Sequence, residues 1–372
     1  MNIDEQLKQI LKFGEGEPFF SFANADGKRW LMPARNMCTA MNLYQPSGPK
    51  GKLVKQGLPW LYWNPVVLHL LHAERLRLAL SDELRALLEH VFEVRNPEFS
   101  IFCGTPCVHQ KITLQVSCGS RIAGYVKVTA SEAIREVFEH ERLILSTLHD
   151  KGIDQVPRCL YCGALSCGLH VFIQTTRKTA HSRVIHSWEA MHSRFLDRLA
   201  MQTRQTALFE QTDFDYDLNR LEGRLSQLSG ASIVEKAMAE VRYYYAGREV
   251  EFSAFQADFT PWNMFEEGGE LFVFDWEYAR LTYPPRLDYF HFRIQTSIFE
   301  QHLPADVICA GFEADGNRLN GIYGDYRFSL KCYLLAVMSL YVNRESGTIS
   351  RDTYNRLAFW VKMLEQLENS DL

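Results

Sequence analysis

Two short stretches carry carboxylate and carboxamide groups at a spacing that could hold a metal ion and accept a proton. Residues 255–265 read FQADFTPWNMF, with Asp258 five positions before Asn263, and residues 274–279 read FDWEYA, with Asp275 ending an apolar run. One carboxylate can orient an attacking hydroxyl and accept its proton, while a second carboxylate and a carboxamide oxygen are hard ligands for Mg²⁺. The same residue types also form turns, so a capped turn before a buried hairpin is the structural alternative.

Phosphoryl transfer also needs a cation on the phosphates of the nucleotide. Lys127 lies in the strand-like run AGYVKVT, and Glu141 lies on the helical segment that follows and can reach back to it. Glu139 is two positions from Glu141, about 200° around the helix, so at most one of the two faces Lys127. A solvated lysine on the outer face of the strand is the alternative.

The expected elements change in type along the chain. Residues 1–95 begin with a hairpin pattern, FFSFA and RWLMP around a polar turn, and then show helical periodicity over residues 68–92. Residues 96–176 have the pattern of five strands in an antiparallel arrangement, with one helix after the third. Residues 177–372 are mostly helical apart from the two stretches that carry the acidic residues. The sequence therefore predicts an α+β protein in three parts, 1–95, 96–176 and 177–372.

These motifs resemble those of the aminoglycoside-phosphotransferase and choline-kinase group, a branch of the protein-kinase-like fold. The loop of that group reads H-G-D-x-x-x-x-N, and the chain has QADFTPWN at 256–263 with the same Asp-to-Asn spacing. The metal strand of the group reads hydrophobic-D-W/F-E, and the chain has FDWE at 274–277. PRLDYF at 285–290 is similar to the helix start that follows, with Asp288 in the acidic place.

The resemblance implies a bilobal fold with a small antiparallel-sheet N-lobe, a mainly helical C-lobe and an extra N-terminal α/β segment. It implies that Asp258 is the catalytic base and that Asn263 and Asp275 bind Mg²⁺. Lys127 would contact the α- and β-phosphates of ATP or GTP, with Glu141 as its partner. The other implied nucleotide contacts come from the hinge and from the turn over the phosphates: Gln174, Thr175, Thr176, Gly104 and Thr105.

Two positions depart from the pattern of the group. Gln256 replaces the His that supports the loop, but a glutamine can still hydrogen-bond the neighbouring backbone, so we expect the loop geometry to survive. The turn GTPCVH at 104–109 is poor in glycine, and Pro106 offers no N–H to a phosphate.

Composition excludes some function classes and predicts a compartment. A formal net charge of −5 gives no support to a nucleic-acid-binding protein. Nine cysteines without a secretory signal predict free thiols in a reducing, cytoplasmic compartment. Six of them fall between 103 and 167, but the second C-x-x-C that would close a zinc site is missing, so zinc is not expected.

The stretch KGKLVKQGLPWLYW at 50–63 mixes lysines with aromatic residues. This mixture suits peripheral contact with the inner face of a membrane or with an anionic glycolipid. Packing on the kinase-like part is the commoner outcome for an apolar stretch of this length.

The sequence therefore predicts an ATP- or GTP-dependent phosphotransferase that acts on a hydroxyl of a small molecule. Sugar or glycoconjugate acceptors rank first, amino alcohols such as choline second and aminoglycosides third. A nucleotide-binding pseudokinase that regulates or scaffolds a partner is the alternative. A third, structural alternative is that residues 1–95 are the interaction module and the kinase-like part anchors them.

Overall fold

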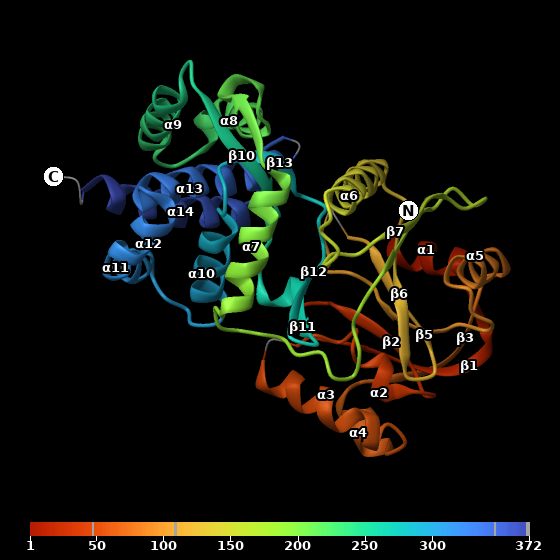
Figure 1. The fold of residues 1–372 in the computed structure, drawn as a ribbon. Coiled ribbons are helices and arrows are strands. Elements are labelled where there is room, and N and C mark those ends of the chain that lie inside the picture. Colours follow the sequence, from red (N-terminus) through yellow and green to blue (C-terminus); the bar gives the residue numbers. More distant parts are fainter. Residues whose placement is uncertain (47, 108–109, 346, 370–372) are drawn as a thin grey trace. The chain divides into compact units, whose positions relative to one another are not determined.

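The structure is a computed structural model that describes residues 1–46, 48–107, 110–345 and 347–369. Two of the residues expected in the turn over the phosphates, at positions 108 and 109, thus lie outside the described residues. The described chain forms two compact units, drawn in Figure 1. The first consists of Met1–His149 and Asp154–Arg183, and the second consists of Asp150–Ile153 and Val184–Leu372.

The first unit is built on one sheet of eight strands in the order β3-β1-β2-β4-β5-β6-β8-β7, with every neighbouring pair antiparallel. The strands are β1 (Leu11–Ala23), β2 (Arg29–Pro33), β3 (Glu74–Leu80), β4 (Glu98–Phe102), β5 (Ile112–Cys118), β6 (Arg121–Thr129), β7 (Cys159–Ala164) and β8 (His170–Thr175). The helices are α1 (Ile3–Ile10), α2 (Met37–Ala40), α3 (Pro49–Leu61), α4 (Pro65–Leu70), α5 (Asp82–Phe92) and α6 (Glu132–Asp150).

The two faces of this sheet carry separate cores, because successive residues of a strand point to opposite sides. Phe19 and Leu31 pack in one core with residues of α1 and α5. Their neighbours Phe20 and Trp30 pack in the other core with residues of α2, α3 and α4. Strand alternation at β1 and β2 thus distributes the helices of residues 1–95 over both faces.

Residues 1–95 and 96–176 contribute strands to the same sheet. The expected hairpin is present as β1 and β2, and the five strands expected in 96–176 are β4 to β8. Strand β2 pairs with β4, with Trp30 opposite Phe102 and Leu31 opposite Ile101. The division of the chain into three parts stays a prediction. The strands of residues 1–95 and of residues 96–176 belong to one continuous sheet.

The helical periodicity expected over 68–92, interrupted near Ser81 and Asp82, is wrong for residues 74–80, which form β3. Leu78 and Leu80 alternate with more exposed neighbours and are buried, and they pair with β1 along an antiparallel register. The sheet partner overrides the helical propensity of the leucines and arginines in this run. Ser81 then starts α5, because its Oγ accepts a hydrogen bond from the N–H of Leu84.

The lysine- and aromatic-rich stretch 50–63 lies mostly in α3. Leu58 is buried in the same core as Trp30, whereas Trp60 and Trp63 are 74% and 64% exposed. The stretch therefore packs along one side, and membrane or glycolipid contact of the other side stays a prediction. Within the described residues, none of the helices is both long and apolar enough to cross a membrane.

The second unit is mainly helical. Its helices are α7 (Ala190–Thr203), α8 (Asp213–Glu222), α9 (Ala231–Tyr245), α10 (Asp288–Phe299), α11 (Ala305–Ala314), α12 (Gly316–Tyr323), α13 (Tyr326–Asn343) and α14 (Arg351–Asn369), with short 3-10 turns at Phe209–Gln211, Leu225–Gln227 and Pro261–Asn263. Its strands are β9 (Gln205–Leu208), β10 (Glu249–Phe255), β11 (Met264–Glu267), β12 (Glu270–Val273) and β13 (Arg280–Tyr283). The expected helices near 286–300, 323–343 and 351–368 are thus present as α10, α13 and α14.

Helix α13 is the centre of the second unit. Its side chains are buried on all sides, from Leu330 and Tyr333 to Val342, and Figure 1 shows α14 running beside it. A helix that is apolar around its whole circumference belongs in a core. The candidate catalytic loop, residues 256–263, connects the end of β10 to the start of the β11–β12 hairpin.

Candidate active site

Asp258 lies in a tight loop after β10 that Asn263 closes. Asn263 Nδ2 donates to Asp258 Oδ2 at 2.8 Å and to the Asp258 carbonyl oxygen at 3.0 Å. Thr260 Oγ1 donates to the same carbonyl at 3.2 Å. The Asp258 side chain remains 35% exposed. The five-residue spacing therefore brings the two residues together, and the Asp258 carboxylate stays accessible.

A buried histidine lies against the other oxygen of Asp258. His291 Nε2 is 3.4 Å from Asp258 Oδ1, and His291 Nδ1 is 3.4 Å from the hydroxyl of Tyr333. If Tyr333 donates to Nδ1, the ring proton is on Nε2 and can be donated to the carboxylate. The sequence alone assigned His291 no role at the site. The sequence feature that could have pointed to His291 is its position three residues after Asp288, which puts both side chains on the same face of a helix.

Gln256 ties the loop to the end of the metal strand. Its Nε2 donates to the carbonyls of Phe274 at 3.2 Å and Asp275 at 2.7 Å, and its Oε1 accepts the N–H of Asp258 at 2.8 Å. The side chain is fully buried. The backbone hydrogen bonding expected of a glutamine at this position is therefore present, and it links Asp258 to Asp275 through one amide group.

Asp288, the first residue of α10, holds the backbone of the same loop. Its Oδ2 accepts the N–H of Gln256 at 2.9 Å and its Oδ1 accepts the N–H of Ala257 at 3.1 Å. Ala257 has φ +73°, a left-handed conformation that favours glycine, which is the residue in the group's H-G-D motif. The two hydrogen bonds to Asp288 hold this strained backbone in place.

The residues expected to bind Mg²⁺ offer a suitable set of oxygen ligands. Because Asn263 Nδ2 is committed to Asp258, its carboxamide oxygen is the atom that can reach a cation. The Asn263 carbonyl accepts the N–H of Phe274 at 3.0 Å, which places Asn263 beside the strand end at Asp275. A carboxylate oxygen of Asp275 and one of Glu277 lie within 4.8 Å of each other. Such hard oxygen ligands fit Mg²⁺, and Glu277 is a ligand candidate that the sequence reasoning did not assign.

In the first unit, Lys127 and Glu141 form a buried ion pair. Lys127 Nζ is 2.7 Å from Glu141 Oε2, and the two side chains are 7% and 0% exposed. Lys127 Nζ also lies over the ring of Phe172, 5.6 Å from its centroid. Glu139 points elsewhere, because it pairs with Arg142. The solvated alternative for Lys127 is therefore wrong, and its contact with phosphates stays a prediction.

We expect Glu141→Gln to destabilise the protein by about 3–5 kcal/mol, because removing one partner of a buried pair leaves the other charge uncompensated. Urea unfolding followed by circular dichroism measures this change. Glu139→Gln on the same helix is the matched control and should cost no more than about 1 kcal/mol, since its pair with Arg142 is exposed. Equal losses in the two variants would contradict the assignment of Glu141 as the buried partner.

The remaining candidate nucleotide contacts lie at two strand ends of the first unit. Gln174 is buried in β8 between β6 and β7, and its Oε1 has no hydrogen-bond partner among the described residues. Thr175 exchanges hydrogen bonds with the backbone of Arg158, and Thr176 Oγ1 accepts the N–H of Lys178. The contacts of Gln174, Thr175 and Thr176 with adenine stay a prediction.

The turn that begins at Gly104 and Thr105 is tightly folded at its start. Gly104 has φ +77°, and a Cβ there would lie 2.4 Å from the carbonyl oxygen of Lys111. Glycine is thus required for the close return of the chain, whatever else the turn binds. Thr105 is exposed. Contact of these two residues with phosphates stays a prediction.

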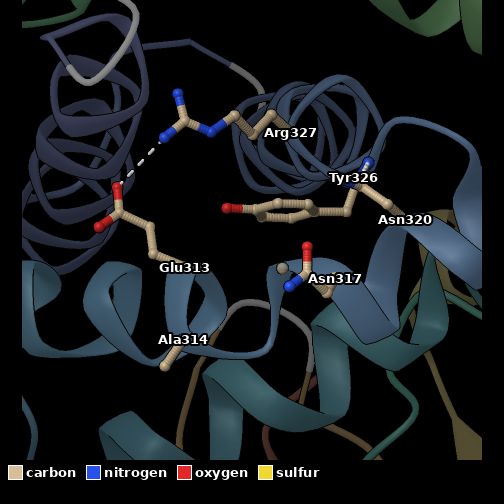
Figure 2. Close-up of a pocket in the computed structure, with 7 residues that line it drawn as sticks. Glu313, Ala314, Asn317, Asn320, Tyr326 and Arg327 are labelled. Carbon is tan, nitrogen blue, oxygen red and sulfur yellow. Dashed lines mark hydrogen bonds and ion pairs between the residues drawn. The ribbon is translucent and has the colours of Figure 1, made fainter.

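A cavity of ≈ 460 Å³ lies elsewhere in the second unit, among α11, α12 and α13. Figure 2 shows the Tyr326 ring beside the ion pair of Glu313 and Arg327, whose closest atoms are 3.4 Å apart. The described residues that line this cavity include none of the candidate catalytic or metal-binding residues. This cavity is therefore separate from the candidate catalytic residues.

Comparisons with known proteins bear on the fold. No protein-family model and no curated protein matches the chain. A thermostable mutant of aminoglycoside phosphotransferase APH(4)-Ia in its apo form is 15% identical, with 77% of this chain and 99% of that chain covered and a TM-score of 0.51. A further variant of it, in a ternary complex with ADP and hygromycin B, is 14% identical, with 77% and 98% covered and a TM-score of 0.52. APH(4)-Ia itself is 13% identical, with 78% and 99% covered and a TM-score of 0.52.

These similarities, at such low identity, concern the fold. They agree with the antiparallel sheet of the N-terminal unit and the helical C-terminal unit. The expected fold class is therefore confirmed: the chain has the α+β, protein-kinase-like fold of the aminoglycoside phosphotransferases.

Proposed function

We propose that the protein is a small-molecule kinase that transfers the γ-phosphoryl group of ATP or GTP to a hydroxyl. The observation that carries the proposal is the Asp258 loop. An accessible carboxylate is fixed there by Asn263 and His291, and Gln256 joins it to Asp275 at the end of the metal strand. The solved relative APH(4)-Ia supports the proposal, because one of its complexes contains ADP and hygromycin B.

Asp258 acts as the base in this mechanism. The acceptor hydroxyl donates its hydrogen bond to the Asp258 carboxylate, the hydroxyl oxygen attacks the γ-phosphorus, and the proton passes to Asp258 as the bond to the β-γ bridging oxygen breaks. Each Asp258 oxygen has one protein contact, from Asn263 or from His291, and a carboxylate oxygen can accept a further hydrogen bond. These contacts fix the direction of the carboxylate before substrate arrives.

The other candidates position the nucleotide. Asn263, Asp275 and Glu277 would hold Mg²⁺, which neutralises charge on the phosphate oxygens when it is bound. Lys127 binds the α- and β-phosphates, and Glu141 fixes the direction of its ammonium group. Sugar or glycoconjugate acceptors remain first in rank, amino alcohols second and aminoglycosides third.

The competing hypothesis is a regulatory pseudokinase, which was motivated by Gln256 and by the glycine-poor turn. Gln256 makes three hydrogen bonds that hold Asp258 and Asp275 in one arrangement. An intact catalytic loop favours the enzyme over the pseudokinase.

The direct test is nucleotide-dependent phosphorylation of a panel of sugars, sugar derivatives, amino alcohols and aminoglycosides with Mg²⁺. We expect acceptor-dependent release of ADP or GDP that stops when EDTA removes the metal. Protein that neither binds nucleotide nor responds to Mg²⁺ would sink the proposal.

We expect Gln256→Ala to lower kcat by about 10²-fold. Asp258 and Asp275 lose the amide that fixes their relative positions, and small displacements of reacting groups lower the rate strongly. Gln256→His should restore part of the rate, since an imidazole can donate from one nitrogen and accept at the other. Steady-state kinetics with the acceptor from the panel, together with thermal unfolding of each variant, measure both effects. Equal rates in wild type and Gln256→Ala would contradict this role of the amide.

A further inference from the structure

Aromatic rings and guanidinium groups contact one another in a series within the second unit. We name this series the arginine–aromatic arc, and its members are Trp262, Phe299, Arg356, Tyr341, Arg344 and Tyr278. Its first part begins in the catalytic loop. Trp262 packs edge-on against Phe299 with ring centroids 5.9 Å apart, and the guanidinium of Arg356 lies 5.1 Å from the centroid of Phe299.

The second part of the arc reaches the segment after the metal strand. Arg356 also lies 5.8 Å from the ring centroid of Tyr341, and Arg344 lies 5.3 Å from that same centroid. Arg344 stacks closely on Tyr278, at 3.5 Å from its centroid. The four rings come from separate segments, and two guanidinium groups are shared between them.

The arc flanks the candidate active site. Trp262 directly precedes Asn263, and Tyr278 follows Asp275 by three residues. Burial raises the pKa of Tyr341, and the charges of Arg344 and Asp258 shift it in opposite directions, so both charges lie near this ring. An acceptor whose hydroxyl reached Asp258 would therefore lie near the arc.

The two arginines retain capacity for an anion. The Arg344 guanidinium contacts the rings of Tyr278 and Tyr341 and forms no ion pair among the described residues. Its Nε is buried without a hydrogen-bond partner, so its terminal nitrogens are the donors offered to an anion. Arg356 Nε pairs with Asp352 at 3.0 Å, but the Asp352 side chain is 78% exposed, and such surface pairs contribute little. Glu345, next to Arg344, is instead bound by Ser350 and Thr353. A guanidinium held against aromatic rings can still donate its remaining N–H groups to phosphate or carboxylate oxygens.

We propose that the arginine–aromatic arc binds an anionic group of the phosphoryl acceptor, so that the acceptor carries a phosphate or a carboxylate besides its reacting hydroxyl. The inference rests on the proposed function and narrows it. Two fixed positive charges repel amino alcohols and aminoglycosides, which places anionic sugar derivatives above both classes.

The test measures binding, so that it does not depend on turnover. Calorimetric titrations use glucose 6-phosphate, glucuronate, glucose and choline, each in the presence of saturating AMP-PNP and Mg²⁺ to block phosphate binding at the nucleotide site. We expect at least one anion to bind ten-fold or more tightly than glucose and choline. A preference for glucose 6-phosphate identifies a phosphate ester as the ligand group, and a preference for glucuronate identifies a carboxylate.

Substitutions of the two arginines test whether the anion binds at the arginine–aromatic arc. Arg344→Met and Arg356→Met should each weaken anion binding about ten-fold or more, while Arg344→Lys should keep part of it by retaining the charge. Arg351→Gln removes an exposed positive charge from the same helix as Arg356 and is the matched control, with no change expected. Thermal unfolding selects the variants that remain folded.

Anion binding that is unchanged in folded Arg344→Met and Arg356→Met overturns the inference, and so does equal affinity for the anions, glucose and choline. No detectable binding of either anion also overturns it. A protein that binds anions through the arc but transfers no phosphoryl group to any acceptor contradicts the proposed function instead.

Discussion

Asp258→Ala is expected to lower kcat for phosphoryl transfer by a factor of about 10²–10⁴, the range that general-base catalysis contributes. The substitution removes the group that accepts the proton of the attacking hydroxyl. It leaves the Lys127–Glu141 pair in the other unit unchanged, so affinity for the nucleotide should stay within a few-fold of wild type. Acceptor-dependent release of nucleoside diphosphate gives kcat, and calorimetric titration of AMP-PNP gives the affinity.

Asp306→Ala is a suitable control, because Asp306 is an exposed carboxylate on α11, away from the loop in the sequence, and should leave kcat unchanged. The split between kcat and nucleotide affinity separates chemistry from folding. An Asp258→Ala variant with wild-type kcat would exclude Asp258 as the base. A variant that loses nucleotide binding together with kcat would instead show that the loop has a structural role.

The second large effect concerns stability. Asp288→Asn should lower the free energy of unfolding by about 2–4 kcal/mol near pH 5. Both carboxyl oxygens of Asp288 accept backbone N–H groups, from Gln256 and Ala257, and the hydroxyl oxygen of the protonated carboxyl keeps a lone pair for this. The NH₂ group of an asparagine is a donor only and cannot accept either N–H. The change is therefore not conservative, although the side chains have the same shape.

The deficit of Asp288→Asn should depend on pH. Burial raises the pKa of Asp288 from 3.8 to about 7, against the two backbone hydrogen bonds that lower it. Between pH 4 and 7 the folded wild type therefore binds more protons at this position than the unfolded chain does, and its stability falls as the pH rises. Asparagine does not titrate, so the difference in the free energy of unfolding between wild type and Asp288→Asn should shrink by roughly 2 kcal/mol from pH 5 to pH 7.

Urea unfolding at several pH values measures this dependence, with Asp306→Asn as an exposed control that should show no such trend. A deficit that grows between pH 5 and pH 7 would show that the buried carboxylate is stabilised by its two N–H donors more than it is penalised by burial. The sign of the slope is thus the informative quantity.

Local patterns were sufficient to predict the loop and most elements around it. Asp258 and Asn263 lie five residues apart, and Asp275 ends an apolar strand, so the residues that meet in the second unit are marked in the sequence itself. Strands β4 to β8 were likewise visible from their alternation and turns. The pattern failed at β3, where alternating leucines and arginines fit a helix and a strand, and the pairing with β1 decides between them.

The groups that hold the site could not be predicted in the same way, because their contacts are tertiary. His291 reaches Asp258 from α10, and Tyr333 reaches His291 from α13. Glu277 is adjacent to the motif residues, but only its distance to Asp275 makes it a ligand candidate. The arginine–aromatic arc draws its residues from several segments with no common spacing, so a linear pattern does not reveal it.

The pairing of β2 with β4 limits how the chain can be shortened. A protein that started at residue 96 would contain all the candidate catalytic residues, but β4 would lose its neighbour and become the edge of the sheet. Phe99 and Ile101, now buried in the core that includes residues of α1 and α5, would then be exposed next to unpaired backbone groups. Such an apolar edge promotes pairing with other chains. The first 95 residues therefore act as a built-in protection against aggregation.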